Sequence, residues 1–158
     1  MSNLAETLAR EDRPVEALEL LGIAHDGLVR VMGPNHPTTL GVQGRLGRVL
    51  AQVGRKEEAR SALEHAGEGM ASSLGSRHPE TVDLLWNLQR VLVSDGSYEL
   101  AKRVLELVVD ARRELYGDNH SATVVAMGAL ADTLERLGEN GAAKRLRRRI
   151  EAATHSSA

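Results

Sequence analysis

The sequence predicts an all-α fold, a solenoid of tandem helix-turn-helix hairpins. Three observations support this prediction. A segment of similar sequence recurs every 42 residues, starting at Gly33, Gly75 and Gly117. Apolar residues follow each segment at helical spacing. Glycines recur at fixed repeat positions, where they would end helices. A repeat of this length that forms one hairpin cannot bury its apolar face alone, so neighbouring copies are expected to stack into a solenoid.

The register of the repeat holds along most of the chain. The recurring segments read GPNHPTTL, GSRHPETV and GDNHSATV. A leucine column contains Leu46, Leu88 and Leu130, and an alanine column contains Ala17, Ala59, Ala101 and Ala143. Projected backward, the register reaches Leu4 and Leu8, so the first unit begins partway through a repeat. We expect a single domain over residues 1–152, with units at about 1–32, 33–74, 75–116 and 117–152, and a frayed tail at 153–158.

Each unit is expected to contain two helices. The first starts at the HPxT segment, because Pro favours the first helical turn and nearby Thr hydroxyls can accept hydrogen bonds from unpaired backbone amides. It ends near Gly54, Gly96 or Gly138. The second helix fills the rest of the unit and ends before the next recurring segment. The alanine column lets the two helices of a hairpin approach to about 8–10 Å.

These motifs resemble the tetratricopeptide repeat, in the 42-residue variety found in kinesin light chains and many bacterial proteins. The resemblance covers nearly the whole chain. It rests on the L-G-x-x-H-P-x-T segment, the Asn-Leu pairs and the Gly-x-Tyr-x-x-Ala turn, represented by Leu74, Gly75, His78, Pro79, Thr81, Asn87, Leu88, Gly96, Tyr98 and Ala101. It implies a right-handed superhelix whose first helices line a concave groove for a peptide or helix of another protein. The chain departs from the family where Leu replaces the usual Tyr or Phe and where Ser121 replaces Pro, and its first helix lacks the first turn.

Composition excludes several classes of protein. The chain has 20 Lys and Arg against 22 Asp and Glu, a net charge of -2, which disfavours a strongly basic nucleic-acid or membrane-surface protein. It has no Cys, so it has no disulfide and no Cys-ligated zinc. Its uncharged apolar runs are far shorter than the roughly 20 residues of a membrane helix. The N-terminus does not read as a secretory signal, and we expect a cytoplasmic protein.

No pattern of residues predicts an active site or a metal site. The aligned His36, His78 and His120 lie one per hairpin, and successive hairpins stack about 10 Å apart. Zinc ligands lie within about 2.3 Å of one ion, so these residues cannot converge on it. We expect them to shape the links between units. With no nucleophile elbow and no phosphate loop, the sequence predicts a non-enzymatic protein without a cofactor.

The candidate binding groove is formed by the first helices of the units. The candidate peptide-binding residues are Arg45, Arg48, Gln52, Asp83, Trp86, Asn87, Arg90 and Asp132. Arg48 and Arg90 share a repeat position and are expected to be neighbours. Guanidinium groups bind carboxylates bidentately, which suits an acidic or C-terminal peptide. Asn87 would hold the peptide backbone, and Trp86, the only Trp, would pack against a ligand side chain.

A structural interpretation of the same residues remains open. The arginines would then pair with Asp83, Asp132 and Glu135 and keep the concave face solvated, while Trp86 would pack within a hairpin. The basic run Lys144–Arg149 is expected to give the last helix a polar outer face, because Arg147 replaces the leucine of earlier units.

The predicted function is that of a protein–protein interaction adaptor or scaffold. The main alternative is self-association through the N-terminal end, where Leu4 and Leu8 have no capping helix and an apolar patch would need cover. That end could equally mark a piece of a longer protein. RNA binding is the least favoured alternative, because the net charge is negative and stacking aromatics are few.

Overall fold

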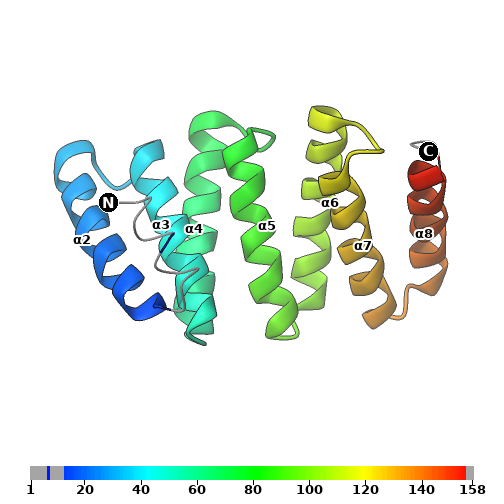
Figure 1. Cartoon of the computed structure of the whole chain (residues 1–158), viewed down its shortest axis with the longest axis horizontal. Helices are drawn as coiled ribbons and strands as arrows, with labels where there is room; N and C mark the ends of the chain where they lie inside the picture. The colour runs from blue at the N-terminus through cyan, green and yellow to red at the C-terminus, as the bar shows by residue number, and fades with distance from the viewer. Residues whose placement is uncertain (1–6, 8–12, 156–158) are drawn as a thin grey trace. The chain divides into compact units, whose positions relative to one another are not determined.

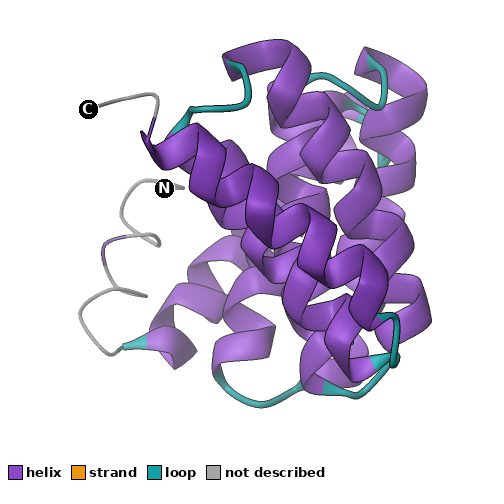
Figure 2. Cartoon of the chain, turned by 90° about the vertical axis from the view of Figure 1, so that its right-hand side faces the viewer, coloured by secondary structure: helices purple, strands orange, loops and turns teal. Residues whose placement is uncertain are grey.

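Helices joined by short loops make up the part of the chain that the structure describes, Thr7 and residues 13–155 (Figure 1). In this computed structural model the helices of that part are α2 (Pro14–Met32), α3 (Pro37–Gln52), α4 (Lys56–Leu74), α5 (Pro79–Ser94), α6 (Tyr98–Tyr116), α7 (Ser121–Arg136) and α8 (Asn140–His155). Figure 2 shows helices and loops, with no strand among the described residues. The all-α prediction is confirmed.

The chain divides into two compact units, Met1–Asn87 and Leu88–Ala158. The division falls inside α5. The first unit contains α2, α3, α4 and α5 up to Asn87, and the second contains the remainder of α5 with α6, α7 and α8. The single domain over residues 1–152, with its four repeat units, stays a prediction.

The helices that follow the recurring segments begin with a histidine cap. His36 and His120 are the N-cap residues of α3 and α7, and their backbones have nearly the same extended conformation. The Nδ1 atom of His36 accepts a hydrogen bond from the backbone amide of Thr38 at 3.2 Å, and His78 and His120 do the same two residues ahead. The imidazole therefore satisfies one of the amides that a helix start leaves unpaired.

The prediction that Thr hydroxyls cap these helices is wrong. The hydroxyls of Thr39 and Thr81 are buried and have no hydrogen-bond partner, and Thr123 donates instead to the carbonyl of Arg112 at 3.2 Å. In each of these helices the Thr lies in the first turn, and its side chain is buried among the packed helices. The histidine just before the helix is the side chain that can reach its free amides.

The aligned glycines end the helices as predicted. Gly33, Gly75 and Gly117 follow α2, α4 and α6, and each amide bonds the carbonyl four residues back. These glycines and their counterparts near the ends of α3, α5 and α7 have φ between 79° and 99°. Such left-handed backbone is costly for other residues and common for Gly, so the sequence specifies these turns.

Small residues allow close helix packing in the first unit. A Cβ added at Gly47 would lie 2.7 Å from Cγ of Leu63 and 3.1 Å from the carbonyl oxygen of Ala59. The backbones of α3 and α4 therefore approach closely at this point. Ala17 and Ala59 are fully buried, which agrees with the predicted alanine column. Between α2 and α3, Ala17, Leu21, Val42 and Val49 form a continuous core.

The second unit combines the same kind of core with polar links between helices. Ala101, Leu105, Ala131 and Ala143 are buried in α6, α7 and α8. At the edge of this core, Lys102 donates to Glu139 at 2.6 Å, which raises the pKa of that lysine. A second link joins α6 and α7, because Arg136 donates to the hydroxyl of Tyr98 at 2.9 Å and its guanidinium lies 5.4 Å from the ring centre.

A candidate binding groove in the first unit

A cavity of about 380 Å³ opens in the first unit between α3, α4 and α5. Its lining consists of Gly41, Gly44, Arg45, Arg48, Met70, Glu80, Asp83, Leu84, Trp86 and Asn87. This size lies within the range of pockets that hold small ligands or a few side chains of a peptide. Both the first helices, α3 and α5, and the second helix α4 contribute to it.

Glycines on α3 shape the cavity. A Cβ at Gly44 would overlap Cδ2 of Leu84, so α5 approaches α3 closely there and Leu84 fills the space. A Cβ at Gly41 would meet only Cε of Met70, at 3.8 Å. The missing side chain at Gly41 therefore leaves open space, while the missing side chain at Gly44 lets the two walls come together. Met70 and Leu84 are buried and give the cavity an apolar base.

A second cavity of about 600 Å³ adjoins the first. The two share Gly41, Arg45 and Glu80 in their linings. The second cavity extends to Leu28 of α2, Leu74 of α4 and His78 before α5, and it also includes Pro37, Thr38 and Val42. Together the cavities form a groove along α3, which we call the α3–α5 groove. One end of this groove holds Arg48 and Asn87, and the other end holds Leu28, Val42 and Leu74.

The charges of the groove are divided between its two walls. Arg45 and Arg48 lie on α3 and are half-buried, whereas Glu80 and Asp83 lie on α5 and are exposed. Asn87 donates from Nδ2 to the carbonyl of Asp83 at 3.0 Å, one turn earlier on the same helix. This bond engages one amide hydrogen and fixes the side chain against α5. The groove therefore presents a basic wall and an acidic wall.

Five of the eight predicted groove residues line this one cavity: Arg45, Arg48, Asp83, Trp86 and Asn87. Gln52 is the exposed last residue of α3 and does not belong to the lining of either cavity described. Arg90 is an exposed residue of the second unit. The expected proximity of Arg48 and Arg90 stays a prediction. Leu4 and Leu8, the predicted self-association residues, lie outside the described residues.

Sequence reasoning missed three of the side chains that line the cavity, those of Met70, Glu80 and Leu84. Met70 was missed because only the first helices were expected to face the groove. Glu80 precedes Asp83 by three positions and Asn87 by seven, which places all three on one face of α5. That spacing was a signal in the sequence that could have identified Glu80.

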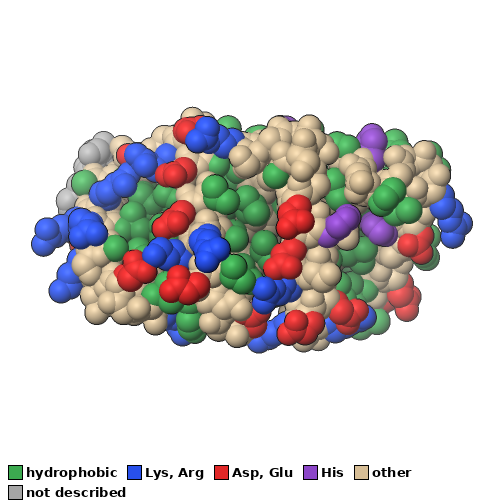
Figure 3. All heavy atoms as spheres, turned by 180° about the vertical axis from the view of Figure 1, so that it is seen from behind, with side chains coloured by type: hydrophobic (Ala, Val, Ile, Leu, Met, Phe, Trp, Pro, Cys, Tyr) green, Lys and Arg blue, Asp and Glu red, His purple; other side chains and the backbone are tan. Residues whose placement is uncertain are grey.

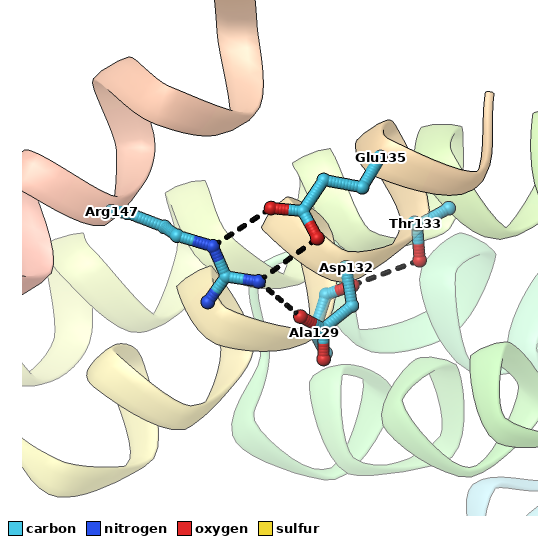
Figure 4. A network of polar contacts seen from close by, with 5 residues as sticks. All are labelled: Ala129, Asp132, Thr133, Glu135 and Arg147. Carbon is cyan, nitrogen blue, oxygen red and sulfur yellow. Dashed lines mark hydrogen bonds and ion pairs between the residues drawn. The ribbon is translucent and has the colours of Figure 1, made fainter. Parts of the chain in front are cut away.

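Asp132 is held by an ion-pair network in the second unit (Figure 4). Arg147 of α8 donates to Asp132 at 2.7 Å and to the two carboxylate oxygens of Glu135 at 2.9 and 3.2 Å. These hydrogen bonds raise the pKa of Arg147 and lower the pKa of Glu135. The residue that replaces a core leucine thus reaches the surface of α7. This arrangement agrees with the structural interpretation of Asp132, although the partner is an arginine from α8.

Other kinds of site are not seen in the described part of the chain. Across Thr7 and residues 13–155, no three His, Asp or Glu side chains are grouped so that they could hold a metal ion. Within the same residues, no helix combines the length and the apolar character that crossing a membrane requires. Figure 3 shows both acidic and basic side chains on the face that it draws, with several basic ones close together at its left end.

Comparison with known proteins identifies the repeat. The family model for the tetratricopeptide repeat matches residues 1–70 and 80–153. The chain is similar to the crystal structure of a kinesin-light-chain-like protein of Podosopora anserina with nearly identical TPR-like repeats, with 25% identity and a TM-score of 0.80 over 98% of this chain and 73% of that one. No curated protein sequence matches.

A second solved structure supports the fold. BtubC (BKLC) from P. vanneervenii is similar with a TM-score of 0.89 and 16% identity, over 99% of this chain and 62% of that one. The helix pattern of the described residues, the matched family and these structures agree on a helical-repeat solenoid. The chain therefore belongs to the tetratricopeptide repeat family, in its kinesin-light-chain-like variety.

Proposed function

We propose that this protein is a non-enzymatic adaptor that binds an acidic or C-terminal peptide segment of a partner protein in the α3–α5 groove. Tetratricopeptide repeats generally mediate protein–protein interactions, and kinesin-light-chain-like members are typically adaptors without catalytic activity. The observation that carries the proposal is the cavity in which Arg45, Arg48, Trp86 and Asn87 lie together.

Each of these residues has a distinct role in the proposal. Arg45 and Arg48 bind carboxylate oxygens of the ligand, since a guanidinium forms charge-assisted hydrogen bonds that are stronger than neutral ones. Asn87 contacts the ligand backbone through the side-chain amide atoms that take no part in its hydrogen bond to Asp83. Trp86 is half-buried in the lining, so a ligand side chain can cover the rest of its ring.

Calorimetric titration with synthetic peptides tests the proposal. The probes are ten-residue peptides with four glutamates, prepared with a free C-terminal carboxylate and as the C-terminal amide. We expect Arg48→Gln to weaken binding of both by about tenfold, because hydrogen bonds to charged groups contribute roughly 1.5–3 kcal/mol. A further loss on amidation, seen in the wild type and absent in the variant, would assign Arg48 to the terminal carboxylate.

The matched control is Arg103→Gln, an exposed arginine of α6 outside the groove. It removes the same charge and should leave affinity unchanged. Equal weakening by Arg103→Gln and Arg48→Gln would mean that the peptides respond to net charge alone. Binding that is unaffected by Arg48→Gln would contradict a role for the groove arginines.

Self-association is a second candidate function. It is supported by the exposed apolar side chains of α2, where Val15 is 63%, Ile23 is 64% and Val31 is 82% exposed. Such side chains favour association when they are covered by a second copy. Sedimentation equilibrium over a hundredfold concentration range tests this function. A mass that rises with concentration in the wild type and not in Ile23→Asp/Val31→Asp supports it, and a constant monomer mass contradicts it.

A cytoplasmic location belongs to the same proposal, and imaging of a fluorescent fusion at native expression level tests it.

RNA binding is the least favoured function, because it predicts a steep dependence of affinity on salt and needs a positive surface. The net charge of -2 does not favour such a surface.

A further inference from the structure

The acidic wall of the α3–α5 groove limits which peptides can bind there. Arg45 and Arg48 on α3 attract a carboxylate, but Glu80 and Asp83 on α5 line the same cavity and repel it. These four side chains carry a net charge of zero. A ligand with acidic residues on both of its edges would place one row of its carboxylates against Glu80 and Asp83. Like charges that face each other across an interface oppose binding.

The repeat provides an internal control for these charges. At the positions equivalent to Glu80 and Asp83, the other described first helices have the uncharged residues Thr38, Gly41, Ala122 and Val125. Neither α3 nor α7 has an acidic residue in its first turn, so the fold does not need one to begin such a helix. The acidic wall is therefore a property of this groove and not of the repeat.

The basic wall is equally specific. The position of Arg45 is occupied by Asn87 in α5 and by Ala129 in α7. The position of Arg48 is occupied by Arg90 in α5, but in α7 it is Asp132, which has the opposite charge. In this cavity, α3 contributes two basic residues and α5 contributes two acidic ones.

The two walls also meet where the cavities join. Arg45 and Glu80 line both cavities, one from α3 and one from α5. An extended ligand that runs from the end at Leu28 to the end at Arg48 must pass these two opposite charges. In an extended chain, successive side chains point to opposite sides. A segment in which acidic and basic residues alternate therefore turns all its carboxylates to one wall and all its ammonium groups to the other.

We propose that the preferred ligand is an extended, mixed-charge segment of a partner protein, with acidic side chains facing α3 and basic side chains facing α5. This inference rests on the proposed function, because it specifies the ligand of the same groove. It adds a requirement for basic residues that an acidic peptide does not meet, and it fixes which edge of the ligand faces which helix.

Three probe peptides of equal length test this inference by calorimetry, each with one leucine at either end. The first contains four Glu-Lys repeats, the second has four Glu followed by four Lys, and the third has eight Glu. The first two have identical composition and net charge and differ only in order. We expect the alternating peptide to bind at least about tenfold more tightly than each of the others.

A charge-reversal variant provides the second arm. Glu80→Lys/Asp83→Lys makes both walls basic, so the preference should move to the eight-Glu peptide by about tenfold or more. The control Glu19→Lys/Glu68→Lys changes the same charge at exposed positions of α2 and α4 outside both linings and should keep the wild-type preference. Circular dichroism spectra that match the wild type show that the variants are folded.

The outcomes separate this inference from the proposed function. Equal binding of the alternating and block peptides, or tighter binding of the eight-Glu peptide by the wild type, would overturn the mixed-charge ligand. The proposed function would still stand in the second case if Arg48→Gln weakened that binding. Absence of binding by all three probes and by the acidic peptides of the previous test would overturn both.

Discussion

At the scale of single residues, the histidines of the recurring segments act as helix caps. His36, His78 and His120 each accept a hydrogen bond from a backbone amide through Nδ1. An accepting Nδ1 carries no proton, so the cap requires the neutral imidazole. The sequence predicted a structural role for these residues, but it did not predict that they cap the helices. The cap depends on the orientation of the imidazole ring.

The cap predicts a specific ranking of variants at His78. His78→Ala should lower the free energy of unfolding by about 1 kcal/mol, the usual cost of losing an N-cap. His78→Asn should retain most of the stability, since Asn is a good N-cap residue and supplies an acceptor at the same place. Urea denaturation followed by circular dichroism measures both. Equal stability of the Ala and Asn variants would mean that the Nδ1 contact does not stabilise α5.

The Arg147 network is a second feature at this scale, and it predicts a dependence on pH. The hydrogen bonds from Arg147 lower the pKa of Glu135, so the pair stabilises the fold at pH above the ordinary Glu value and loses this effect as pH falls through the lowered pKa. The stability difference between the wild type and Arg147→Gln should therefore shrink as pH falls from 6 to 3.

Arg148→Gln is the control for this experiment. Arg148 is an exposed neighbour on α8 for which no ion pair is found in the described part of the chain. Its variant should show a much weaker dependence on pH relative to the wild type. A difference between wild type and Arg147→Gln that stays constant down to pH 3 would show that Glu135 does not contribute through its charge.

At the scale of helices, glycine has two different roles in the first unit. Gly47 faces α4, where a side chain would meet Leu63 and the backbone of Ala59. Gly27 lies in α2, and a Cβ there would meet nothing within 4 Å. Glycine therefore permits close packing of α3 at Gly47, whereas at Gly27 it only weakens α2. Gly lowers helix stability by roughly 1 kcal/mol relative to Ala.

These two sites give opposite predictions. Gly27→Ala should raise the free energy of unfolding by about 0.5–1 kcal/mol, since it improves helix propensity without a clash. Gly47→Val should lower it by about 1–3 kcal/mol, because the backbone of α4 must move to make room. Thermal unfolding of both variants beside the wild type measures the two effects. A stabilising Gly47→Val would contradict the close approach of α3 and α4.

At the scale of the whole chain, the repeat explains how much could be predicted. The helix ends at Gly33, Gly75 and Gly117 followed from the sequence, because left-handed backbone and the 42-residue period leave little choice. The same register placed Arg45, Arg48 and Trp86 on one side of the first helices, and the structure brings them to one cavity. What repeats in the sequence was therefore predictable.

The features that do not repeat were harder to predict. Met70 enters the cavity lining from a second helix because Gly41 leaves space for it. Arg147 was expected to be a polar replacement in the last helix, but its partners depend on the path of its side chain toward Glu135. Both depend on contacts between side chains of different helices, which the period of the repeat does not determine.

The central claim is that a peptide binds in the α3–α5 groove, and quenching of Trp86 fluorescence by acrylamide tests it most directly. Trp86 is the only Trp of the chain and lies in the cavity lining, so all tryptophan emission reports on the groove. A saturating amount of the alternating Glu-Lys peptide should shield the ring and lower the quenching constant, and Arg48→Gln should shift this effect to higher peptide concentration. If calorimetry shows that the peptide binds while the emission and the quenching constant of Trp86 stay unchanged, the ligand lies elsewhere and the account is wrong.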